Sequence, residues 1–234
     1  MAHIDTTQAG SRGIQVDSLA GSAVIVTADD GSLALSDGTL SIRGDFARLL
    51  SRIKPANLSR ELVVKAARIK GAGSPLRVVD ATAGLGEDSF LLAAAGFEVR
   101  LHENNPIIAA LLADALERAA RDERLASIVA RMELHQVDSL VALHELPYQP
   151  DVVLLDPMFP ERHKSASVKK KLQLLQQVEQ PCTDEEALLE AAFAAQPRRI
   201  IVKRPAKGPY LAGRKPDYAL SGKAIHFDCY AVQG

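Results

Sequence analysis

The chain has 234 residues, 47% of them hydrophobic and 24% charged, with a formal net charge of −1. This composition is typical of a folded α/β domain with a small appendage, and it excludes a disordered or fibrous protein. Two cysteines are too few to hold the fold together by disulfides, and no apolar run approaches the roughly 20 residues that cross a bilayer. We therefore expect a cytoplasmic protein with free thiols and no membrane segment.

The first 54 residues contain short apolar runs separated by turn sequences, Asp-Asp-Gly-Ser and Ser-Asp-Gly. Such spacing predicts a small β-meander. Its expected strands are 23–27, 33–35 and 39–42.

A helix is predicted next, from Ser59 to Ile69, with Ser59 as its N-cap and Gly71 just after its end. The change of pattern predicts two domains. Residues 1–56 would form a β-rich N-terminal subdomain, and residues 57–234 the main domain.

From Arg77 onward, apolar runs alternate with helical patterns, which is typical of a parallel sheet with crossover helices. The predicted strands are 77–81, 98–103, 132–137, 151–156 and 198–204, and the predicted helices are 88–95, 106–120, 140–146 and 184–196. The β-rich tail, 223–232, is expected to add an antiparallel edge strand. The predicted fold class is therefore α/β, with a doubly wound, mostly parallel, Rossmann-like sheet.

A glycine-rich turn with Gly84 and Gly86 follows the first predicted core strand and precedes a helix. Bare backbone and helix N-terminal amides at such a turn face a ligand at the carboxyl edge of the sheet. Read alone, the turn also fits a dinucleotide. Asp80, just before the glycines, can hold the ammonium group of a methionine moiety, whereas it would repel a pyrophosphate, and Asp88 adds to that repulsion. The local charge thus favours S-adenosylmethionine over a nicotinamide cofactor.

Two further strand ends carry acidic residues. Glu103 ends the second predicted strand, where a carboxylate can accept both hydroxyls of an adenosine ribose, although nicotinamide enzymes use the same position. Asp138 and Ser139 follow the third strand, where the adenine amino group and a ring nitrogen would lie.

The sequence Asp156-Pro157-Met158-Phe159-Pro160 follows the fourth predicted strand and is similar to the D/N-P-P-F/Y motif of methyltransferases that modify planar exocyclic nitrogens. The lone pair of such a nitrogen is delocalised, so acceptors must hold its hydrogens and orient it toward the methyl group. Asp156 and the carbonyl next to Pro157 would be these acceptors, and Phe159 would stack on the base. Because the donor is already an activated cation, no metal ion is expected.

Charge is distributed unevenly along the chain. Residues 1–76 contain 9 basic and 7 acidic residues, residues 77–150 contain 6 and 12, and residues 151–234 contain 13 and 10. A polyanion would be repelled by the middle segment and attracted by the two flanks. An RNA-facing surface is therefore expected from the flanks, including the basic residues of 162–171 and 198–207.

Taken together, the motifs resemble those of the ribosomal RNA small subunit methyltransferase J family. The resemblance covers about two thirds of the chain and rests on 78–88, 156–160, 164–170, 202–205, 222–223 and 226–230. It implies N2-methylation of a guanine in 16S ribosomal RNA, free or in the small subunit, with S-adenosylmethionine as donor. The cofactor contacts that it implies are Glu87, Asp88, Glu103, Asn104, Asp138, Ser139 and Asp156.

Other functions stay open at this point. A methyltransferase acting on adenine in a nucleic acid, or on a protein glutamine, would share the cofactor motifs and the Asp-Pro sequence. A nicotinamide-dependent enzyme and a non-catalytic RNA-binding protein are less favoured.

Overall fold

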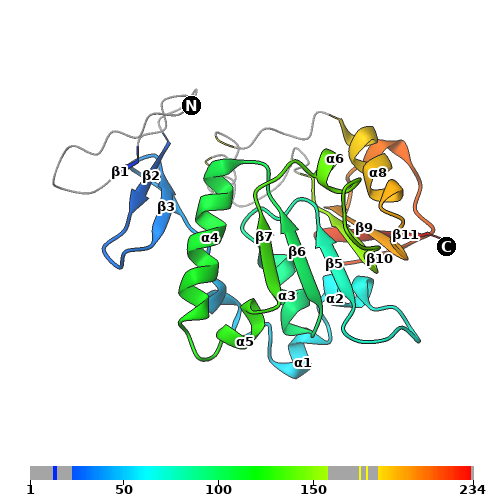
Figure 1. Cartoon of the computed structure of the whole chain (residues 1–234), viewed down its shortest axis with the longest axis horizontal. Coiled ribbons are helices and arrows are strands. Elements are labelled where there is room, and N and C mark those ends of the chain that lie inside the picture. The colour runs from blue at the N-terminus through cyan, green and yellow to red at the C-terminus, as the bar shows by residue number, and fades with distance from the viewer. Residues whose placement is uncertain (1–12, 15–22, 158–173, 175–177, 179–183, 233–234) are drawn as a thin grey trace.

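The computed structural model describes residues 13–14, 23–157, 174, 178 and 184–232. Its centre is a seven-stranded sheet with the order β10-β11-β9-β8-β5-β6-β7 (Figure 1). The five strands from β9 to β7 are parallel, and β11 and β10 add an antiparallel edge. The bounds are β5 Arg77–Asp80, β6 Glu98–His102, β7 Met132–His135, β8 Val152–Leu155, β9 Arg199–Pro205, β10 Tyr218–Ser221 and β11 Ile225–Ala231. This is the predicted doubly wound sheet.

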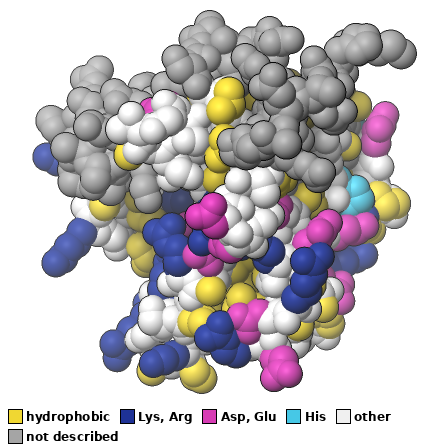
Figure 2. Space-filling view, turned by 90° about the vertical axis from the view of Figure 1, so that its left-hand side faces the viewer, with side chains coloured by type: hydrophobic (Ala, Val, Ile, Leu, Met, Phe, Trp, Pro, Cys, Tyr) yellow, Lys and Arg dark blue, Asp and Glu magenta, His cyan; other side chains and the backbone are white. Residues whose placement is uncertain are grey.

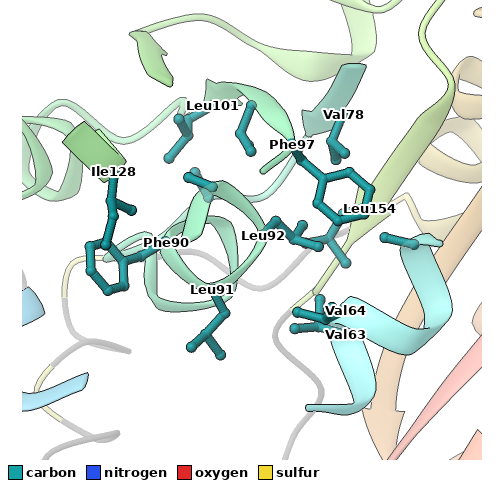
Figure 3. Packing of buried hydrophobic residues seen from close by; sticks show 14 of the residues in the cluster. Val63, Val64, Val78, Phe90, Leu91, Leu92, Phe97, Leu101, Ile128 and Leu154 are labelled. Carbon is teal, nitrogen blue, oxygen red and sulfur yellow. The ribbon is translucent and has the colours of Figure 1, made fainter. Parts of the chain in front are cut away.

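Helices cover both faces of this sheet. The main-domain helices are α2 Leu62–Ala67, α3 Glu87–Ala94, α4 Pro106–Ala120, α5 Ala126–Val129, α6 Ser139–Ala142 and α8 Glu185–Ala194, with a 3₁₀ turn, η2, at Leu211–Gly213. On one face, α2, α3 and α5 pack on alternate strand residues such as Val78 and Leu154 (Figure 3). On the other face, α8 packs on Val79, Val153 and neighbouring residues. Because successive strand side chains point to opposite faces, these continuous apolar strands are buried on both sides.

Local signals fix the longest helix, α4, at the predicted bounds Pro106–Ala120. Asn105 is its N-cap, and the side-chain oxygen accepts from the N–H groups of Ile107 and Ile108. Pro106 stands at the first helical position, where its missing N–H costs nothing. Within the described ranges no helix is long and apolar enough to span a membrane.

The N-terminal strands form a separate four-stranded antiparallel sheet, β1-β2-β3-β4, which lies beside α4 (Figure 1). Its strands are β1 Gly13–Ile14, β2 Val24–Thr27, β3 Leu33–Ser36 and β4 Ser41–Ile42. This sheet is the predicted meander with one additional strand, β1. Leu35 and Ile42 share an apolar cluster with Ile108 and Leu111 of α4. The small sheet is thus packed on the main domain, and the boundary at residues 56/57 remains a prediction.

The helix predicted from Ser59 to Ile69 is wrong in its bounds. A 3₁₀ turn, η1, covers Phe46–Leu49, and a short helix, α1, covers Pro55–Leu58 and ends at Ser59. Pro55 starts α1 because its fixed φ suits the first helical position. The second helix, α2, begins only at Leu62, and Arg68 ends it with extended backbone. Ser59 therefore closes one helix and does not cap the next.

Candidate active site

The glycine turn lies between the carboxyl end of β5 and the start of α3. Gly84 and Gly86 have φ angles of +54° and +74°, which side-chain-bearing residues rarely adopt. A Cβ atom on Gly86 would lie 2.8 Å from a methyl group of Leu112, whereas one on Gly84 would meet nothing within 4 Å. The turn is therefore packed on α4 at Gly86 and has bare backbone facing open space at Gly84.

Glu103 joins this turn to the end of β6. Its carboxylate accepts from the N–H of Gly84 at 2.9 Å and from the N–H of Asn105 at 2.8 Å. The side chain is only 7% exposed, and burial raises its pKa, although the backbone N–H donors oppose that shift. Since a carboxylate has about four acceptor positions, Glu103 still has positions for ligand hydroxyls.

Asp80 is turned toward the protein interior. It accepts from the hydroxyl of Ser89 at 2.5 Å and from the N–H of Thr82 at 3.2 Å. Burial raises its pKa to about 7, against these two hydrogen bonds. In this structure Asp80 thus supports the turn from inside, and a direct contact with a ligand ammonium stays a prediction.

Asp156 follows β8, the strand next to β5. Its N–H donates to the hydroxyl oxygen of Thr82 at 2.5 Å, so the Asp-Pro sequence and the glycine turn are held together. The Asp156 side chain is 39% exposed, and Pro157 is buried. The strand order reverses between β5 and β8, and ligands bind at such a switch point in open α/β sheets. Phe159 lies outside the described residues.

Lys203 of β9 is a site residue that the sequence analysis did not single out. Its ammonium group lies 2.7 Å from a carboxylate oxygen of Asp88 and 2.7 Å from one of Asp156. Burial alone would lower its pKa, but the two carboxylates raise it above the ordinary value. The strand end Val202-Lys203-Arg204-Pro205 carried a signal for this residue, yet only its positive charge was used.

The other predicted contacts lie around the same edge. Asp138 is the N-cap of α6 and is exposed, and its carboxylate accepts from the N–H of Leu140. The buried hydroxyl of Ser139 donates to the carbonyl of Ala81 at 2.6 Å. Glu87 and Asn104 are exposed, the first in the opening turn of α3 and the second just after β6.

The basic residues 198–207 are largely engaged inside the protein, contrary to the expectation of an RNA-facing group. Arg199 donates to the carbonyls of Ala66 and Arg68, and buried Arg204 pairs with Asp228. Lys207 is exposed. The basic segment 162–171 lies outside the described residues.

The edge collects the carboxylates of Asp88, Glu103 and Asp156 around one ammonium group, that of Lys203. A negative site fits the sulfonium and ammonium charges of S-adenosylmethionine and would repel a pyrophosphate. The fold, the glycine turn with open space at Gly84, and the acid ending β6 together define a Rossmann-like methyltransferase site.

Comparisons with known proteins agree with that class. A family model described as "Putative SAM-dependent methyltransferase" matches residues 11–232. A protein of Thioalkalivibrio sulfidiphilus named Ribosomal RNA small subunit methyltransferase J is 46% identical over 222 residues, covering 91% of this chain and 86% of the relative. A protein of the same name from Marinobacter nauticus is 48% identical over 74% of this chain and 63% of its own length. The chain belongs to the ribosomal RNA small subunit methyltransferase J family of S-adenosylmethionine-dependent methyltransferases.

Solved structures show the same architecture. A SAM-dependent methyltransferase from Neisseria gonorrhoeae is 32% identical, with a TM-score of 0.69, over 87% of this chain and 80% of that one. An rRNA methyltransferase from Streptomyces viridochromogenes has a TM-score of 0.51 at 19% identity, over 76% and 85%, which shows likeness of fold only. The chain is thus an enzyme with S-adenosylmethionine as its cofactor, and the nicotinamide alternative is set aside.

Proposed function

We propose that this enzyme transfers a methyl group from S-adenosylmethionine to the exocyclic N2 of a guanine in small-subunit ribosomal RNA. The observation that carries the proposal is the position of Asp156, at the switch point beside the glycine turn, with its carboxylate partly open to solvent. The name of the relatives, Ribosomal RNA small subunit methyltransferase J, supports the RNA substrate. The resemblance of the motifs supports guanine N2.

In this proposal Asp156 accepts a hydrogen bond from the guanine amino group and orients its lone pair for in-line attack. When bound, S-adenosylmethionine supplies an activated methyl group on a sulfonium sulfur. The new N–C bond forms as the S–C bond breaks, and the extra proton on nitrogen passes to water. Phe159 is proposed to stack on the base.

The cofactor contacts are proposed from the strand ends. Glu103 would accept the ribose hydroxyls while it holds Gly84. Asp138 and the Ser139 backbone would meet the adenine, and Glu87, Asp88 and Asn104 would line the remaining edge. We propose an indirect role for Asp80, which shapes the turn through Ser89 and Thr82.

The RNA surface is proposed to come from the flanks of the chain and from Lys207, which follows β9 at the edge of Asp156. On the face shown in Figure 2, Lys and Arg side chains are interspersed with Asp and Glu, with no single basic patch among the described residues. Mixed charge favours contacts to phosphates at several separate points over one continuous basic groove. Action on ribosomal subunits would place the enzyme in the cytoplasm.

Transfer of a labelled methyl group tests the proposal. Small ribosomal subunits, naked 16S rRNA and DNA, all from a strain that lacks the enzyme, are incubated with it and digested to nucleosides. The proposal expects N2-methylguanosine from rRNA or from the subunit. Label in methyladenine, in DNA or in protein would support the alternative amine substrates, and RNA binding without any transfer would support a non-catalytic role.

A further inference from the structure

Lys203 connects two parts of the active edge that come from different strands. Its ammonium group reaches Asp88, in the first turn of α3, and Asp156, after β8, at 2.7 Å each. One cation thus bridges the helix that follows the glycine turn and the proposed amine-binding motif. An ammonium group has three donors, and two of them are used in these contacts.

Several further charged groups face this pair. Asp80 of β5 lies close enough to Asp88 and Asp156 for both to raise its pKa. Arg52 and Glu87 act on the Asp88 side, where Arg52 is itself paired with Glu61 at 2.8 Å. Three aspartates therefore share the neighbourhood of Lys203. Without this cation, mutual repulsion would favour protonation of at least one of them.

A protonated Asp156 would be a poor partner for an amine. Its carboxyl group would offer an O–H donor toward N–H donors, and it would lose acceptor capacity. Free rotation would also cost the alignment that in-line transfer needs, because small misplacements at a reacting centre lower the rate strongly.

We infer that Lys203 is the positioning residue of this enzyme: by bridging Asp88 and Asp156, it keeps the Asp156 carboxylate ionised and aimed at the substrate amine, and it fixes the start of α3 relative to that carboxylate. The inference rests on the proposed role of Asp156 and assigns Lys203 no contact with RNA phosphate. Lys203 acts through Asp156 and does not itself touch the reacting atoms.

The test combines kinetics with a measurement that needs no substrate. Lys203→Met and Lys203→Arg are compared with the wild type and with Lys65→Met, which alters an exposed lysine of α2. The carboxyl titrations of Asp88 and Asp156 are followed by ¹³C NMR, assigned with Asp88→Asn and Asp156→Asn. In Lys203→Met at least one of these carboxyls is expected to titrate about one pH unit or more above its wild-type value.

The rate should follow the titration. In Lys203→Met, kcat for methyl transfer at pH 7 is expected to fall about tenfold or more, with recovery as the pH rises. Lys203→Arg should keep both the titrations and most of the rate, and Lys65→Met should match the wild type. A merely structural role would lower the rate equally at every pH.

Unchanged carboxyl titrations in Lys203→Met would overturn the inference, as would upward shifts of equal size in Lys203→Arg. If the wild type transfers no methyl group to rRNA or the subunit, the proposed function fails. The NMR titrations still decide the role of Lys203 in that case, so the two failures are distinguishable.

Discussion

Lys203 and Arg204 are neighbours on β9 and both are paired with carboxylates, but they point to opposite faces of the strand. Lys203 meets Asp88 and Asp156 at the active edge, where the Asp156 side chain is partly open to solvent. Arg204 meets Asp228 of β11, whose side chain is 0% exposed, and it also donates to the carbonyls of Pro205 and Gly208.

The difference between the two pairs lies in what each connects. Arg204 and Asp228 join two adjacent antiparallel strands, β9 and β11, which are already hydrogen-bonded along their length. Lys203 joins a helix start and a loop that share no strand pairing with each other. We therefore expect loss of Arg204 to appear in the free energy of unfolding, and loss of the carboxylate partner of Lys203 to appear in the rate.

The largest expected effect is on stability, in Arg204→Met. Removing the cation leaves Asp228 buried and uncompensated, and breaking a buried ion pair in this way costs about 3–5 kcal/mol. Urea unfolding monitored by circular dichroism measures the loss. The double variant Arg204→Met/Asp228→Leu should recover part of it, because no buried charge remains. A loss below about 1 kcal/mol in the single variant would contradict a structural role for this pair.

The next effect is on catalysis, in Asp156→Ala. Removing the acceptor for the amine should lower kcat by about 10²–10³-fold, the range found when one transition-state hydrogen bond is lost. Initial rates of labelled methyl transfer measure it, and calorimetric binding of S-adenosylmethionine serves as the control for folding. Asp156→Asn keeps one acceptor oxygen and should lie between the two. A variant Asp156→Ala that transfers methyl groups at the wild-type rate would refute the role proposed for this residue.

The central sheet was predictable because its strands are buried on both faces and read as continuous apolar runs. The predicted strands at 77–81, 98–103 and 151–156 correspond to β5, β6 and β8. The helix Pro106–Ala120 was predicted to the residue, since Pro106 marks its start locally. The acids at the strand ends followed from the topology alone.

The features that sequence reasoning missed depend on tertiary contacts. Strand β10, Tyr218–Ser221, has a mostly exposed pattern and exists through its pairing with β11. Lys203 is separated from Asp88 by 115 residues, and only the parallel pairing of β9 with β8 places it beside Asp156. Asp80 was predicted near the ligand from its place before the glycines, whereas Ser89 turns its carboxyl inward. Charge type in a sequence does not reveal the partner.

Glu103 extends the comparison to a carboxylate held by backbone amides. Glu103→Gln keeps one acceptor oxygen but places an amide donor among N–H donors, so Gly84 or Asn105 loses its partner. We expect the Kd for S-adenosylmethionine to rise about tenfold or more, equivalent to about 1.4 kcal/mol, while Glu98→Gln, at the exposed start of the same strand, leaves it unchanged. Isothermal titration calorimetry measures both. An unchanged Kd in Glu103→Gln would exclude Glu103 as the holder of the turn.

Asp80 provides the last comparison, a buried carboxyl group with no cation bonded to it. Burial raises its pKa from 3.8 to about 7, so the folded protein holds a proton that the unfolded chain releases at lower pH. This contribution to stability is present below about pH 4 and is lost as the pH rises through 7. Asp80→Asn cannot ionise, so its free energy of unfolding should gain on the wild type between pH 4 and 7, by about 1.4 kcal/mol or more. Parallel urea titrations at intervals across this range measure the difference between the two proteins. A difference that stays constant, or that shrinks with rising pH, would show that Asp80 is ionised in the folded state and balanced by a cation, as Asp156 is by Lys203.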